Sequence, residues 1–151
     1  MREIKFRAYQ KNFKRMLPVT SIEFECNNNE IESITVDNRG VNGEYDAIPW
    51  FSTYRDGYEE FTLDSLVLLQ YTGLRDKNGN KIFEGDICAH ENMYHYPNLL
   101  VVEWIEELAC FSFVDRTDYH KNYFFQKTNT ESGLKVVGNI YDKRRGSKNN
   151  I

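Results

Sequence analysis

Residues 65–89 read SLVLLQYTGLRDKNGNKIFEGDICA, a series of apolar runs separated by turn-forming residues. Ser65–Tyr71 is apolar at most positions, which is typical of a strand buried on both faces. Asn78-Gly79 separates this run from Lys81–Phe83, and Asn-Gly between two strand-like runs is a strong hairpin signal. The stretch therefore predicts a β-hairpin, closed at Asn78-Gly79 by a type I′ turn.

Alternation of apolar and polar residues with a period of two appears repeatedly, and a helical period is nearly absent. The stretches that show it are Glu3–Tyr9, Ile22–Cys26 and Ile34–Val36. Four further short stretches are also interpreted as strands: Ile87–Ala89, Leu99–Ile105, Cys110–Val114 and Leu134–Tyr141. Glu84 and Asp86 flank Gly85, which indicates a tight turn rather than a catalytic carboxylate pair. Gly138 is expected to mark a bulge in the last strand. Short strands at this spacing predict a mainly-β fold, either a small barrel or a sandwich.

Composition supports the same fold class. Aromatic residues make up 15% of the 151 residues, with ten Phe, ten Tyr and two Trp. Aromatic side chains fit the half-buried surface of a sheet, so we interpret them as core and cross-strand packing. The length allows one domain, or two very small ones that share a core.

Three cysteines, Cys26, Cys88 and Cys110, are widely spaced and odd in number. The sequence shows no export signal, and no apolar run is long enough to span a bilayer. We therefore expect unpaired thiols in a cytosolic protein without membrane association. No glycine-rich loop carries the lysine and following helix that bind phosphate, so no cofactor is expected.

Cysteine and histidine come close together in the sequence at Cys88, His90 and His95, with Cys110 and His120 further along. Thiolate and imidazole are zinc ligands, and four of them could close a tetrahedral site. However, the spacing lacks the paired Cys-x-x-Cys or His-x-x-x-His of structural zinc sites. These residues are weak metal candidates, and the preferred interpretation places the cysteines in the core. Cys88 and His90 are two residues apart and would share a face of a strand, but no third orienting group can be named, so no catalytic residue is predicted.

Charge is unevenly distributed along the chain. Residues 1–15 carry a net charge of +5 and residues 142–151 of +3, whereas residues 16–141 carry −12, for a total of −4. Basic ends with interleaved aromatics are one composition that serves nucleic-acid binding, here through Lys5, Arg7, Lys143, Arg144 and Arg145. The overall acidity argues against it, because counterion release rewards a net basic footprint. The alternative is that the N-terminal cations pair with the acidic body and the C-terminal tail is solvated.

Three segments resemble the YopX family of phage and prophage proteins. They are Arg2–Tyr9, Gln70–Ile87 (with its Tyr-Thr-Gly-Leu-Arg-Asp-Lys-Asn-Gly core) and Val136–Tyr141, in the family's order. The chain departs from the family at Tyr9, where Trp is expected, and in the basic residues that follow Tyr141.

The resemblance implies an SH3-like small β-barrel built mainly from the second half of the chain, and expression from a mobile element in a bacterial cytosol. We accordingly expect an N-terminal β region over 1–62, the barrel over 63–141 and a basic disordered tail over 142–151. The resemblance carries no catalytic residue, and a fold does not by itself identify a function. The leading hypothesis is a non-enzymatic module that binds a host or phage protein, through an aromatic face or a sheet edge. A nucleic-acid-binding module is the alternative, and an enzyme or metal protein is the least favoured class.

Overall fold

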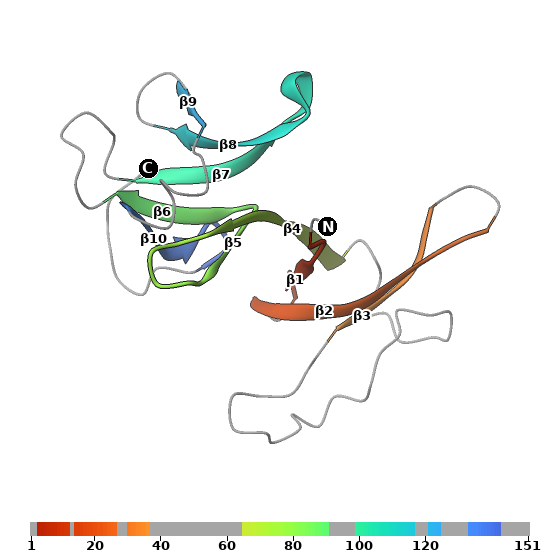
Figure 1. Cartoon of the computed structure of the whole chain (residues 1–151). Coiled ribbons are helices and arrows are strands. Elements are labelled where there is room, and N and C mark those ends of the chain that lie inside the picture. Colours follow the sequence, from red (N-terminus) through yellow and green to blue (C-terminus); the bar gives the residue numbers. More distant parts are fainter. Residues whose placement is uncertain are drawn as a thin grey trace. The chain divides into compact units, whose positions relative to one another are not determined.

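The computed structural model describes residues 3–12, 14–26, 30–36, 65–90, 99–116, 121–124 and 133–142 (Figure 1). The strands are β1 (Phe6–Gln10), β2 (Arg15–Phe24), β3 (Ile31–Val36), β4 (Leu66–Arg75), β5 (Lys81–Phe83), β6 (Asp86–His90), β7 (Leu100–Ile105), β8 (Cys110–Asp115), β9 (Lys121–Tyr123) and β10 (Leu134–Asn139), with a 3₁₀ turn, η2 (Glu106–Leu108), between β7 and β8. They form two antiparallel five-stranded sheets with the orders β3-β2-β1-β4-β5 and β10-β6-β7-β8-β9. The predicted mainly-β class is confirmed.

The chain divides into two compact units. The N-terminal unit is Lys5–Leu69, and the C-terminal unit combines Met1–Ile4 with Gln70–Ile151. Strand β4 begins in the first unit and ends in the second.

The N-terminal unit is built on the β1–β2 hairpin, whose register runs from Arg7 opposite Pro18 to Gln10 opposite Arg15. Strand β3 pairs with the outer part of β2. The buried apolar side chains described in the N-terminal unit are Ala8, Leu17, Ile34 and Leu69. The Gln10 side chain is fully buried, and its Oε1 accepts a hydrogen bond of 2.9 Å from Arg15 Nε across the hairpin.

The C-terminal unit has a core to which five strands contribute. It consists of Ile82 on β5, Cys88 on β6, Leu100 and Val102 on β7, Phe113 on β8 and Leu134 on β10. Each of these side chains is at most 1% exposed, so the unit has a dry centre. The alternate positions on β7 and β8 face the opposite side, as the period of a strand requires.

The predicted β4–β5 hairpin is present, but the predicted turn type is wrong. Gly79 N donates to Asp76 O at 2.9 Å and Asp76 N donates to Asn80 O at 2.8 Å, which encloses a loop of three residues. Gly79 has φ +81°, whereas Asn78 is not among the described non-glycine residues with positive φ, as a type I′ turn would require. The arrangement is the longer hairpin loop with one left-handed glycine, in which only Gly79 needs that freedom.

The carboxylate of Asp76 holds this loop from the inside. Its Oδ1 accepts hydrogen bonds from the backbone N–H of Asn78 (2.9 Å) and Asn80 (2.8 Å). Its Oδ2 accepts from Asn80 Nδ2 and from the backbone N–H of Val136 on β10, both at 3.1 Å. Burial works against ionisation, but the hydrogen bonds outweigh it and lower the pKa of Asp76 below its ordinary value.

The same contacts join the β4–β5 turn to the edge strand β10. Leu134 O on the outer edge of β10 accepts from Lys77 N at 2.9 Å, and Val136 N donates to the Asp76 side chain. A turn and a carboxylate thus cover this part of the β10 edge. The expected SH3-like barrel is not confirmed, because the strands form two sheets that are not closed into a barrel.

A second buried carboxylate, Asp86, organises the bend between β5 and β6. Its Oδ2 accepts from Phe83 N at 2.8 Å and its Oδ1 from Asn139 Nδ2 at 3.3 Å, which confirms the turn chemistry expected there. Gly85 has φ +76°, and a Cβ at this position would lie 3.2 Å from Asn139 Nδ2. The predicted irregularity in the last strand is also confirmed, since the β10–β6 register shifts between Val136 and Gly138.

In the part of the chain that the structure describes, no helix has the length and apolar character required to cross a bilayer.

Candidate functional site

The candidate site is the closed end of the β7–β8 hairpin, residues 103–111, here called the hairpin end. The β6–β7 ladder is confined to Leu100 and Val101, whereas the β7–β8 ladder continues to Ile105 opposite Cys110. Figure 1 shows β7 and β8 curving away from β6 toward their connecting turn. Ala109 closes the turn in the left-handed region, with φ 47°, and its N–H donates to Glu106 O at 3.2 Å. The hairpin end therefore extends beyond the β6–β7 ladder as two strands, and Trp104 and the turn residues 106–109 are exposed.

An aromatic pair gives the hairpin end its shape. Trp104 and Phe111 lie directly opposite each other, with ring centroids 5.1 Å apart and an interplanar angle of 72°. Phe111 packs against the core, while Trp104 remains 41% exposed. Leu108, in the turn, is 56% exposed. The edge-to-face contact with a partly buried ring orients the indole and leaves one large apolar surface in contact with water.

Carboxylates surround these apolar groups. Glu103 pairs with Arg116 on the neighbouring strand end, with Nε and Nη2 of Arg116 at 2.9 and 2.8 Å from its Oε1. Glu106 and Glu107 are exposed, and Glu106 Oε2 accepts a hydrogen bond of 3.2 Å from Trp104 Nε1. Glu106 and Glu107 are thus solvated at the hairpin end, whereas Glu103 is half-buried.

Glu84 adds a further carboxyl group beside the base of this hairpin. Burial raises the pKa of Glu84, a hydrogen bond from the Gln70 backbone partly offsets this effect, and the negative charge of Glu103 adds to it. Glu84 and Glu103 are therefore close enough to repel each other.

The metal candidates do not assemble. Cys88 is fully buried in the core. His90 lies on the same strand with its ring against Gly133, where a Cβ would approach His90 Nε2 to 2.6 Å. His95 and His120 lie outside the described residues. Among the residues described, no three His, Cys, Asp or Glu side chains are grouped so as to hold a metal ion, and the three cysteines form no disulfide.

The nucleic-acid candidates are only partly described. Lys5 is exposed just before β1, and Arg7 is half-buried on β1. Lys143, Arg144 and Arg145 lie outside the described residues. The structure thus brings none of the described candidates into a contiguous basic face.

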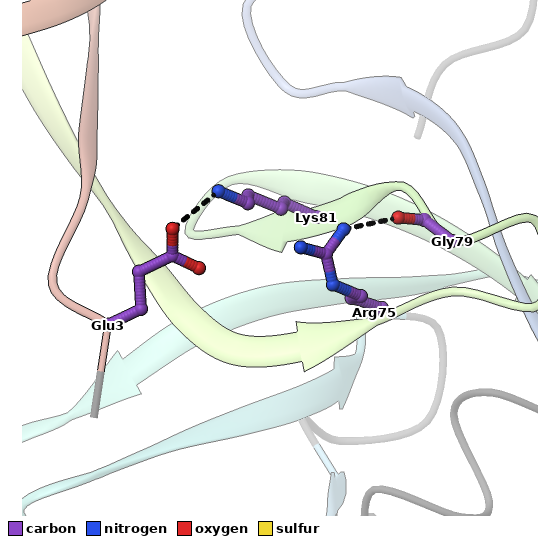
Figure 2. A network of polar contacts seen from close by, with 4 residues as sticks. All are labelled: Glu3, Arg75, Gly79 and Lys81. Carbon is purple, nitrogen blue, oxygen red and sulfur yellow. Dashed lines mark hydrogen bonds and ion pairs between the residues drawn. The ribbon is translucent and has the colours of Figure 1, made fainter. Parts of the chain in front are cut away.

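Two cations that the sequence did not single out lie opposite each other on the β4–β5 hairpin. Figure 2 shows Lys81 pointing toward Glu3, at 2.9 Å, and Arg75 toward the carbonyl oxygen of Gly79, at 2.7 Å. Lys81 Nζ also lies 5.4 Å from the ring centroid of Tyr71. Like charges that face each other across a ladder are unfavourable, and these contacts offset that cost. Both cations are thus engaged within the C-terminal unit.

The pairing of Trp104 with Phe111 follows from the sequence once the two strands and their connection are assigned. Two strands joined by the four residues 106–109 place Ile105 opposite Cys110, and therefore Trp104 opposite Phe111. The exposure of Trp104 does not follow from the local sequence, because it depends on where β6 ends relative to β7.

Comparison with known proteins gives a family and a solved structure. A family model described as "YopX protein" matches residues 5–145. The crystal structure of protein EF1440 from Enterococcus faecalis is similar, with a TM-score of 0.62 and 28% sequence identity, covering 93% of this chain and 95% of that one. No curated protein matches the chain.

Proposed function

The chain belongs to the YopX family, and from this premise and the geometry of the hairpin end we propose that it is a non-enzymatic protein-binding module. The observation that carries the proposal is the exposed, oriented indole of Trp104 at a projecting hairpin. Tryptophan is enriched among the residues that dominate binding energy at protein interfaces.

The arrangement of polar groups supports a binding role over catalysis. Asp76 and Asp86, the two most deeply buried carboxylates described, direct their oxygens at backbone and amide donors within loops. Groups committed in this way stabilise turns and are not aimed at a cleft. The aromatic surface is also a better candidate than strand addition at β10, since part of that edge is already hydrogen-bonded.

The resemblance to phage and prophage proteins supports a role as an accessory protein in the cytosol of a bacterial host. Its partner would then be a host or phage protein. The acidic net charge of −4 favours a protein partner over nucleic acid.

Affinity capture from bacterial lysate, with and without nuclease, tests the proposal. We expect a protein to be retained after nuclease treatment, to be lost with Trp104→Ala and to be kept with Phe24→Ala. Phe24 is a matched control because it is an aromatic residue, 55% exposed, in the other unit. Retention that disappears with nuclease would refute the proposal and favour the nucleic-acid alternative.

A further inference from the structure

The charged side chains of the hairpin end are all negative. Residues 103–111 contain three glutamates and neither lysine nor arginine. Arg116 neutralises Glu103, but Glu106 and Glu107 form no ion pair with any residue that the structure describes. A partner that covers this surface must therefore offer positive charge or leave carboxylates without a counterion.

The acidic and aromatic groups are also held next to each other. The hydrogen bond of 3.2 Å from Trp104 Nε1 to Glu106 Oε2 places a carboxylate at the edge of an indole that is partly exposed to water. A guanidinium group stacks on an indole face and pairs with carboxylates, so one arginine could use both groups together. Leu108 supplies an adjoining apolar contact.

We propose that the hairpin end binds a segment of a partner protein in which arginine alternates with apolar side chains. This inference rests on the proposed function and specifies the chemistry of the partner. The same charges disfavour nucleic acid at the hairpin end, because its phosphates would meet Glu106 and Glu107.

A defined peptide provides the test. The probe is a fluorescein-labelled Gly-Arg-Leu-Arg-Leu-Arg-Gly peptide, titrated with the full-length protein and followed by fluorescence anisotropy. The comparison probe has glutamate in place of each arginine. We expect the arginine peptide to bind and the glutamate peptide not to bind.

Matched variants locate the binding surface. Trp104→Ala should weaken binding at least about tenfold, as for an interface anchor, and Phe24→Ala should leave it unchanged. Glu106→Gln with Glu107→Gln should weaken it about fivefold and reduce its salt dependence, because each exposed pair contributes modestly and is screened. Glu32→Gln, at an exposed position of β3 in the other unit, is the charge control.

Three results would overturn the inference: no binding of the arginine peptide, equal binding of the glutamate peptide, or full binding by the double glutamine variant. If one of these results occurs but capture of a protein from lysate still depends on Trp104, the inference about the partner's chemistry is wrong and the proposed function stands. Two other occupants have their own signatures. Self-association that is lost in Trp104→Ala would assign the surface to a second copy, and at least tenfold tighter peptide binding after Lys143, Arg144 and Arg145 are changed to Ser would assign it to the chain's own tail.

Discussion

Replacing Asp76 with asparagine tests whether one carboxylate holds the β4–β5 loop against β10. The side chain accepts four hydrogen bonds and is 1% exposed. Asparagine has nearly the same shape but exchanges one acceptor oxygen for an NH₂ donor. Whichever way the amide is turned, it meets two groups that now donate to the carboxylate.

The magnitude follows from the less costly of the two orientations. If the NH₂ group occupies the Oδ2 position, the exposed Asn80 side chain can turn its own oxygen toward it, but Val136 N loses its acceptor. A buried donor left without a partner costs about 1–3 kcal/mol, and the remaining bonds lose their charge assistance. We expect Asp76→Asn to lower the free energy of unfolding by about 2 kcal/mol, and Asp76→Ala, which loses all four bonds, by about 4 kcal/mol.

The pH dependence gives an independent readout. Because the folded pKa of Asp76 is lowered, its stabilising contribution is fully present above the ordinary value of 3.8 and is lost as pH falls through the folded pKa. The difference between the wild-type protein and Asp76→Asn should therefore be large at pH 7 and shrink below pH 3.8.

Urea denaturation at several pH values measures both effects. Asp142→Asn is the matched control, because exposed Asp142 accepts a single bond, 2.8 Å from Asn139 N, which an amide oxygen can replace. A loss below about 0.5 kcal/mol for Asp76→Asn, or a loss that does not change with pH, would refute the reasoning.

Three further predictions concern other parts of the C-terminal unit. Gly79→Val should lower the free energy of unfolding by at least about 1 kcal/mol, measured by urea denaturation. A Cβ at this position meets open space, so the cost comes from the backbone, whose φ of +81° is unfavourable for valine. An unchanged urea midpoint would contradict the assigned turn. Glu84→Gln should stabilise the protein at pH 7. The folded pKa of Glu84 is raised, so the contribution of this carboxyl group to stability is fully present below pH 4.5 and is lost as pH rises through the folded pKa. Equal melting temperatures of the variant and the wild-type protein at pH 7 would contradict this sign. Because Cys88 is a core thiol, the purified protein should contain substoichiometric zinc and keep its melting temperature in chelator, whereas one zinc per chain by elemental analysis would reverse that interpretation.

The sequence by itself determined the features that depend on local patterns. Alternation with a period of two located β1 and parts of β2 and β3, because a strand with one buried face repeats every second residue. Short apolar runs between turn signals located most of the strands from β4 onward. Asn78-Gly79 located the hairpin, and Gly85-Asp86 located the bend, since both depend on backbone freedom and short-range hydrogen bonding.

The tertiary structure alone decided which distant groups complete these local features. Asp76 bonds Val136 across 60 residues of sequence, and Glu3 pairs with Lys81 across 78. The first contact joins the β4–β5 turn to β10, and no local pattern in the sequence reveals it. Trp104 lies on the core side of β7 by its period, yet it is exposed because the β6–β7 ladder ends at Val101. The candidate site exists for that reason: strand periodicity specifies the face of a side chain, but only the lengths of neighbouring strands determine whether that face is covered.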